Sequence, residues 1–219
     1  LGANGVGKST LLRTLSAFQP KIEGVISVLG RDVDSYSDRE LSTTIGVVLT
    51  EKCDIRNMSV HELVGMGRSP YTGFWGRLSK EDKRIVEESI ALVKIENLTS
   101  RMVHTLSDGE RQKVMIAKAL AQETPVIFLD EPTAFLDLPN RYTLATLLRR
   151  LAREERKCIL FSTHDLDIAL SLCDSVALID TPSLHHLPAG EMVGSGLIEH
   201  LFSGENARFD PETRTVRLR

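Results

Sequence analysis

The sequence predicts an α/β fold built on a parallel β-sheet. Two apolar runs, Val126–Leu129 and Cys158–Ser162, lack the alternation of half-exposed strands, which indicates strands buried on both faces. The stretch between them, roughly Pro139–Glu155, has helical character, and the order strand, helix, strand implies right-handed parallel crossovers with helices on both sheet faces. Residues 52–120 have mostly helical character, so we expect a helical subdomain inserted into this core.

The segment before residue 52 is expected to supply the first elements of the core. A helix should run from Lys8 to about Phe18 and end by Pro20, because proline lacks the backbone N–H that a helix interior needs. Gly24–Gly30 and Ile45–Leu49 then have the composition of strands, the second of them β-branched and buried.

The predicted helical subdomain contains one strongly marked helix. Ser79 and Asp82 have the spacing of a capping box at its start. Its apolar positions share one face and are Ile85, Val86, Ile90 and Val93. Upstream of it, Tyr71, Phe74 and Trp75 form an aromatic segment that we expect in the core of this subdomain; contact with a partner protein is the alternative.

The second half of the chain repeats the strand–helix pattern. A helix over Leu166–Cys173 and a strand over Ser175–Ile179 should extend the parallel unit. Residues 187–219 carry glycines and short β-like runs and are expected to form a C-terminal extension. We therefore expect one domain, with a core made of residues 1–51 and 121–186.

The overall composition is that of a soluble globular protein. The chain has 219 residues, of which 42% are hydrophobic and 26% charged, with a formal net charge of −3. There is no basic excess that would indicate a nucleic-acid partner, and no apolar run approaches the roughly 18 residues needed to span a bilayer. Membrane contact is thus expected to go through a partner protein. The cysteines, Cys53, Cys158 and Cys173, lie too far apart in the sequence for a metal-binding pair.

The first residues form the most specific motif. Gly2–Thr10 matches the pattern of glycine, four residues, then Gly-Lys-Ser, in which a glycine-rich turn leads into a helix with free N–H groups. A turn that binds nothing is disfavoured, because a helical run follows directly. Lys8 would bring a positive charge to the β- and γ-phosphates of ATP, and Ser9 a hydroxyl to Mg²⁺. The candidate nucleotide-binding residues are Gly2, Asn4, Gly5, Gly7, Lys8, Ser9 and Thr10.

Further candidates fall at strand ends, where ligands gather in parallel sheets. Asp130 and Glu131 follow one apolar strand and His164 follows the next. Beside a phosphate-binding loop, Asp130 is expected to hold Mg²⁺ and Glu131 to polarise the water that attacks the γ-phosphate, with His164 as a sensor of that phosphate. Alone, the acidic pair is better explained as a helix cap or an arginine partner, and the histidine as an ordinary strand-end residue; the phosphate-binding loop in the same sheet reverses this preference.

A second decisive stretch is Leu106–Gln112. Ser107 is expected to cap a helix, with Glu110 as its capping-box partner. A helix start that offers a serine hydroxyl beside Gly109 also suits a phosphate group.

Taken in order, the motifs resemble those of the ATP-binding subunit of ATP-binding cassette (ABC) transporters, within the P-loop NTPase class. Gly67–Ser79 further resembles importer ATPases for iron-siderophores, haem and cobalamin. The motifs that carry the family resemblance are Gly2–Ser9 (Walker A), Leu106–Glu110 (signature), Val126–Glu131 (Walker B), Ala134–Asp137 (D-loop) and His164 (switch histidine).

The resemblance implies an ATPase that works as a head-to-tail homodimer with ATP and Mg²⁺. Each ATP would lie between the phosphate loop of one subunit and Ser107 and Gly109 of the other, with Asp137 also at the nucleotide. Closure on ATP would drive integral-membrane permease subunits, and indirectly a substrate-binding protein, at the cytoplasmic face of the inner (cell) membrane. The implied cargo is an iron complex, such as a siderophore or haem, or cobalamin.

Three residues depart from the family pattern, and each adds negative charge. Glu51 stands where glutamine is usual, and we expect it still to reach Mg²⁺ and support catalysis. In the signature, Asp108 replaces glycine and Glu110 replaces glutamine. Glutamate serves a capping box as well as glutamine does, and Asp108 is expected to point away from the nucleotide.

Only Leu1 precedes the phosphate loop, whereas family members carry strands and an adenine-stacking aromatic residue there. We therefore expect an N-terminally truncated chain that binds ATP weakly and self-associates through exposed strand edges.

Three other functions compete with the transporter ATPase. A soluble cassette ATPase of DNA repair or of the ribosome should carry a coiled-coil insertion or a basic surface. A small-molecule kinase would have no reason to contain Leu106–Glu110, and in a non-catalytic regulator Glu131 would be dispensable. The ordered motifs favour the transporter ATPase.

Overall fold

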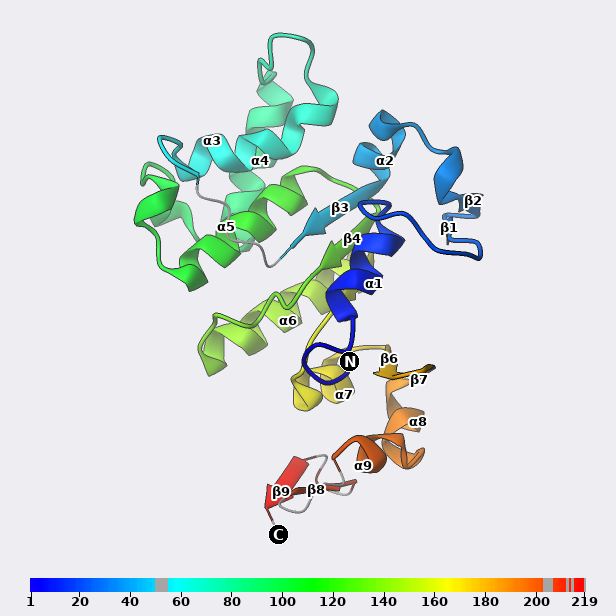
Figure 1. The fold of residues 1–219 in the computed structure, drawn as a ribbon. Coiled ribbons are helices and arrows are strands. Elements are labelled where there is room, and N and C mark those ends of the chain that lie inside the picture. The colour runs from blue at the N-terminus through cyan, green and yellow to red at the C-terminus, as the bar shows by residue number, and fades with distance from the viewer. Residues whose placement is uncertain (50–54, 203–206, 212, 214, 219) are drawn as a thin grey trace.

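The centre of the fold is a parallel sheet of three strands in the order β3 (Ile45–Val48), β4 (Val126–Leu129) and β5 (Cys158–Phe161) (Figure 1). The register pairs Val48 with Leu129 and Leu129 with Phe161, so the carboxyl ends of the strands are level. All four residues of β4 are buried, as the continuous apolar run predicts. The computed structural model describes residues 1–49, 55–202, 207–211, 213 and 215–218.

Helices cover both faces of this sheet. On β4, Ile127 and Leu129 pack in one apolar cluster with α6 (Leu138–Glu154). Val126 and Phe128 pack in another cluster, with Leu12 of α1 (Lys8–Leu15). Since successive side chains of a strand point to opposite faces, β4 is held between helices on either side. The predicted α/β class is confirmed.

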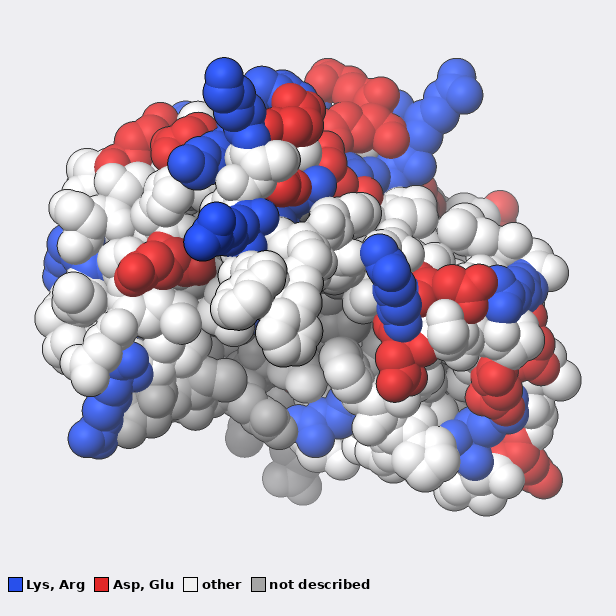
Figure 2. All heavy atoms as spheres, turned by 90° about the horizontal axis from the view of Figure 1, so that it is seen from above, with Lys and Arg blue, Asp and Glu red and all other residues white. Residues whose placement is uncertain are grey.

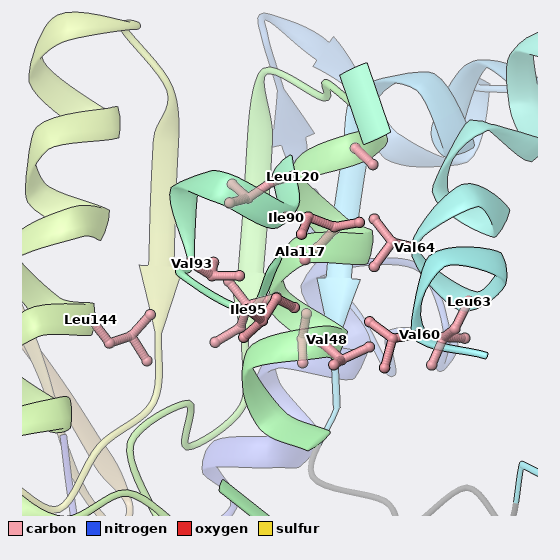
Figure 3. Packing of buried hydrophobic residues seen from close by; sticks show 14 of the residues in the cluster. Val48, Val60, Leu63, Val64, Ile90, Val93, Ile95, Ala117, Leu120 and Leu144 are labelled. Carbon is pink, nitrogen blue, oxygen red and sulfur yellow. The ribbon is translucent and has the colours of Figure 1, made fainter. Parts of the chain in front are cut away.

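A layer of helices packs against one face of the sheet. Its central helices are α3 (Val60–Gly65), α4 (Lys80–Leu92) and α5 (Asp108–Ala121), and residues 55–121 contain no described β-strand. Figure 3 shows how Val60, Val64 and Ile90 meet in a core that Val48 of β3 joins to the sheet. The short 3₁₀ segments are η2 (Met66–Tyr71), η3 (Glu96–Leu98) and η4 (Val103–Thr105).

Serine capping boxes begin the three main helices of this layer. In each, the serine hydroxyl accepts the backbone N–H three residues on, and the acidic side chain at that position accepts the serine N–H. This satisfies two backbone donors at each helix start. The boxes at Ser79 and Ser107 confirm the sequence predictions, and the pairs are Ser59–Glu62, Ser79–Asp82 and Ser107–Glu110.

Two early predictions are corrected. Helix α1 ends at Leu15, before Phe18, because Ala17 has a left-handed φ of 61° that stops the helical path. Within Gly24–Gly30 only β1 (Ser27–Val28) is strand, and it pairs antiparallel with β2 (Arg31–Asp32). The 3₁₀ turn η1 (Val33–Ser35) and helix α2 (Asp38–Thr44) then lead into β3.

The predicted parallel role of β6 (Ser175–Asp180) is found only in part: Leu1 bonds to Ala177 and Ile179 in the pattern of parallel neighbours, but no described strand pairs with β6 in parallel. This strand pairs antiparallel with β7 (Ser183–Pro188) in a hairpin of its own. Two residues separate these strands, which is too short for the crossover of a dozen or more residues that parallel neighbours require. On its other side, β6 accepts a bond from the Leu1 amino group at Ala177 O (2.7 Å) and donates one from Ile179 N to Leu1 O (2.8 Å).

The last elements form a separate apolar cluster with α7 (Leu166–Leu172) and β6. Its fully buried members include Leu178, Met192 and Phe209. The predicted β-like run near the C-terminus is confirmed as β9. The elements after β7 are α8 (Ala189–Gly194), α9 (Leu197–Phe202), β8 (Ala207–Asp210) and β9 (Thr215–Leu218).

The aromatic segment does not lie in the core. The side chains of Phe74 and Trp75 are 96% and 81% exposed, so the predicted burial is wrong for both. Tyr71 lies at the edge, where its hydroxyl donates to Gln122 O at 2.9 Å. The glycines at 73 and 76 form a turn, with Gly76 N bonded to Gly73 O, that carries the two rings away from the helices.

Glycine at position 67 allows η2 to approach α5 closely. A Cβ at Gly67 would lie 2.3 Å from Lys118 O and 3.1 Å from Ala121 Cβ. We predict that Gly67→Ala lowers the free energy of unfolding by about 1–3 kcal/mol, because the backbones must separate. Gly73→Ala is the matched control, since nothing lies within 4 Å of its Cβ position. Equal denaturant midpoints for the two variants would contradict the prediction.

Candidate functional site

The glycine loop, residues 2–7, leads into helix α1, whose start has no side-chain cap. Gly7 takes a left-handed φ of 105° as N-cap of α1, which an L side chain disfavours. No side chain caps α1, and its first turn holds no acidic residue. Each helix from α2 to α7, in contrast, has a side-chain cap. The first N–H groups of α1 are therefore open to an anion.

The start of the loop is fixed against β6. Gly2 is buried, and a Cβ there would lie 2.9 Å from Ile179 O. Together with the two hydrogen bonds of Leu1 to β6, this close approach sets where the loop begins.

Lys8, Glu131 and His164 meet, as the motifs predict. The Lys8 ammonium lies 3.5 Å from Glu131 Oε1, and His164 Nδ1 lies 3.8 Å from the same oxygen. The Lys8 side chain is 7% exposed and also donates to the carbonyls of Gly2 and Ala3, both at 3.1 Å. The carboxylate of Glu131 thus lies between the lysine of the loop and the histidine that follows β5.

Ser162 is a site residue that the sequence analysis missed. Its hydroxyl donates to Asp130 Oδ1 at 2.6 Å and accepts the Glu131 N–H at 2.9 Å. Both Asp130 and Ser162 are buried. The available signal was the strand register: Leu129 lies opposite Phe161, so the next residues of β4 and β5 meet at the strand ends.

Glu131 has an unusual backbone conformation. Its φ of 44° lies in the left-handed region, which costs a non-glycine residue on the order of 1–3 kcal/mol. The bond from Glu131 N to Ser162 and the bond from Ala134 N to Glu131 O hold this conformation. Such strain, kept in place by its surroundings, is common at functional sites.

Ser107, Gly109 and Asp137 do not join this cluster. Ser107 caps α5, and Asp137 caps α6 by accepting the Asn140 N–H. Gly109 packs against the segment before α6, where a Cβ would lie 3.1 Å from Phe135 O. The α5 start therefore contacts the segment before α6 of its own chain, and Figure 1 shows it apart from the glycine loop.

The two signature departures have local partners. Ser107 N and Oγ donate to Glu110, which lowers the pKa of its carboxyl group, as expected of a charged capping-box member. Asp108 lies 3.7 Å from Arg111 Nη1, one helical turn away.

Of the remaining candidate residues, the structure describes all but one. Asn4, Ser9 and Thr10 are exposed on the loop and the first turn of α1. Glu51 lies outside the described residues. The described residues contain no cluster of three or more His, Cys, Asp or Glu side chains able to hold a metal. Ser9 and Asp130 offer the oxygen ligands that Mg²⁺ prefers, so these residues fit an ion that binds together with nucleotide phosphates.

Fold and site together define a P-loop nucleotide-binding protein. Residues 1–134 match the family model described as ABC transporter. This match covers more than half of the 219 residues, so the chain belongs to the ABC transporter family, as an ATP-binding subunit.

Relatives support the assignment. An uncharacterized ABC transporter ATP-binding protein of Methanocaldococcus jannaschii is 44% identical over 179 residues, 82% of this chain. The chain spans 62% of the length of that relative. The ferric enterobactin transport ATP-binding protein of Escherichia coli is 35% identical, covering 92% of this chain and 75% of its own. A solved inward-facing putative metal-chelate type ABC transporter superposes with a TM-score of 0.80 at 30% identity, covering 92% and 75% of the two chains.

We predict that Ser162→Ala impairs both the site and the fold. The variant leaves Asp130 Oδ1 without this donor and the N–H of the strained Glu131 without its acceptor. Unfolding free energy should fall by about 1–3 kcal/mol. ATP hydrolysis should slow by about 10- to 100-fold, because the acidic residues lose their orientation. Ser171→Ala, at an exposed hydroxyl on α7, is the control, and a variant as active as this control would refute the role of Ser162.

Proposed function

We propose that this chain hydrolyses ATP as the ATPase subunit of an ABC importer. The observation that carries the proposal is the meeting of Lys8, Glu131 and His164 beside an uncapped helix start. This arrangement combines an anion site, a cation and a carboxylate with a neighbouring histidine, which are the groups that phosphoryl transfer to water needs.

Each residue has a definite task in this proposal. The N–H groups at the start of α1 bind the phosphates, and Lys8 exchanges Glu131 and the loop carbonyls for phosphate oxygens. Glu131 then orients the attacking water and accepts its proton, and His164 contacts the γ-phosphate. Ser9 and Asp130, together with Glu51, would hold Mg²⁺, which neutralises charge on the phosphates.

The nucleotide-binding set is completed by a second copy of the chain. Ser107 and Gly109 lie at a helix start suited to phosphate, yet they contact the segment before α6 and not the loop of their own chain. A head-to-tail homodimer would bring them, with Asp137, to the ATP of the partner. The same arrangement supplies a physical reason for the exposed position of Ser107.

The proposed cargo is an iron complex, such as a siderophore or haem, or cobalamin. Supporting it are the resemblance of Gly67–Ser79 to importer ATPases, the ferric enterobactin relative and the metal-chelate transporter structure. No described helix is long and apolar enough to cross a membrane. From the family to which it belongs, the subunit would act on integral-membrane permease subunits, and through them on a substrate-binding protein, from the cytoplasmic face of the inner (cell) membrane. The alternative is a soluble ABC ATPase without a transport role.

We predict that Glu131→Gln slows ATP hydrolysis by about 10²- to 10⁴-fold while ATP still binds, because the amide cannot accept the proton of water. Phosphate release and equilibrium dialysis measure the two effects, with Glu154→Gln on the surface of α6 as control. In proteoliposomes with the cognate permease, uptake of labelled ferric siderophore, haem or cobalamin should fall in parallel. Hydrolysis without uptake of any of these cargoes would disprove the cargo; an active Glu131→Gln would disprove the mechanism.

We predict that two inactive variants restore activity when mixed. Lys8→Ala removes phosphate binding by the glycine loop and leaves the α5 start intact. Ser107→Arg blocks the α5 start and leaves the glycine loop intact. Half of the dimers in an equal mixture are mixed, and each of these holds one intact site, so about a quarter of the wild-type rate should return. Ser79→Ala controls for loss of a helix cap, and unchanged melting midpoints show that the variants fold. No recovery in a mixture shown to contain mixed dimers would rule out the shared site.

A further inference from the structure

Residues 72–79, which include the exposed Phe74 and Trp75, form a loop between η2 and α4 that we call the tip loop. Phe74 and Trp75 occupy its tip, with ring centroids 5.6 Å apart in an edge-to-face arrangement. Both side chains are almost fully exposed. Figure 1 shows this tip loop at the end of the helical layer furthest from the glycine loop.

Buried polar contacts hold both ends of the tip loop. Arg68, before the loop, is buried and donates to Asp82 Oδ1 at 2.9 Å. Asp82, after the loop, also accepts the N–H and hydroxyl of Ser79, and these bonds lower the pKa of its carboxyl group. Arg68 further donates to Ala121 O and Glu123 Oε2 at the end of α5. The base is thus fixed while the two rings project from it.

Basic side chains that have no ion-pair partner in the described part of the chain flank the tip loop. Arg77, Lys80 and Lys83 are exposed, and their charged ends have no partner among the described residues. The neighbouring Glu81 is paired with Arg84, which also pairs with Glu88. Figure 2 looks onto this end of the molecule and shows lysine and arginine side chains interspersed with aspartate and glutamate. The side chains nearest the rings that have no described ion-pair partner, Arg77 and Lys80, are therefore positively charged.

These features fit a lipid surface better than a protein surface. A stable protein interface buries roughly 800 Å² on each partner, whereas at the tip two side chains, Phe74 and Trp75, project from the loop. Tryptophan and phenylalanine favour the level of the lipid headgroups, and lysine and arginine next to them are attracted by anionic lipids. The rings and the charges lie on one loop, so both can act at once.

We propose that the tip loop binds an anionic lipid surface, with Phe74 and Trp75 entering the headgroup region and Arg77 and Lys80 contacting lipid phosphates. Composition alone predicts that membrane contact goes through a partner protein; the exposed tip adds direct contact. Binding of this kind depends on neither the cargo nor ATP hydrolysis, so it can be tested separately from the proposed function.

The chain offers a built-in reporter, because Trp75 is its only tryptophan. Its emission should shift to shorter wavelength on addition of vesicles of phosphatidylcholine and phosphatidylglycerol, since the indole leaves water. Vesicles of phosphatidylcholine alone should give a smaller shift, and high salt should reduce the difference. Unchanged emission with anionic vesicles would overturn the proposal. If the shift required membranes that contain the permease, the tip would contact protein and the proposal would be wrong.

Flotation with the anionic vesicles tests the residues. The double variant Phe74→Ser, Trp75→Ser and the double variant Arg77→Gln, Lys80→Gln should each bind roughly tenfold or more weakly than the unaltered chain. A matched control, Phe18→Ser with Leu29→Ser, changes two exposed apolar side chains elsewhere and should bind as the unaltered chain does. Equal binding by all variants, with ATP hydrolysis intact in each, would overturn the proposal.

Discussion

The hydroxyl of Ser162 connects the two strands on which the site depends. It donates to Asp130 and accepts from the backbone of Glu131, so one group at the end of β5 fixes two acidic residues at the end of β4. The bridge is possible because β4 and β5 run parallel in level register. Without this hydroxyl, the buried Asp130 carboxylate would lose a hydrogen-bond donor and the strained Glu131 N–H would lose its acceptor. Both losses cost stability, because water does not readily replace the missing partner at a buried position.

Lys8 and Glu131 are likewise held in place by their neighbours beside the glycine loop. The ammonium is almost buried and has three oxygen neighbours, two loop carbonyls and the Glu131 carboxylate. In the proposed site, an incoming phosphate would compete with these oxygens, but it would bring more charge and would meet the N–H groups at the uncapped start of α1. Its affinity would then depend on Lys8 exchanging one set of oxygen partners for another.

The sequence predicts this core well wherever the signal is local. The buried run of β4, the caps at Ser79 and Ser107 and the acidic pair after β4 are all found as expected. The errors arise where tertiary context decides. The strand character of β6 is right, but its partner is set by a two-residue turn, and Phe74 and Trp75 are apolar yet carried outward by a glycine turn. Ser162 was missed because its role depends on strand register, which one sequence does not display.

The close packing of Gly109 against Phe135 has a mechanical consequence. Gly109 contributes only backbone atoms to its contact with Phe135, and no flexible side chain lies between them. A shift of the α5 start toward Phe135 must therefore displace the segment before α6. That segment is tied to Glu131 through the bond from Ala134 N to Glu131 O. In a dimer, Ser107 would bind the phosphate of one ATP, and Glu131 of the same chain would serve the other ATP. A change at Ser107 would then be transmitted to Glu131 through the backbone of residues 132–134, which would couple the two nucleotide sites.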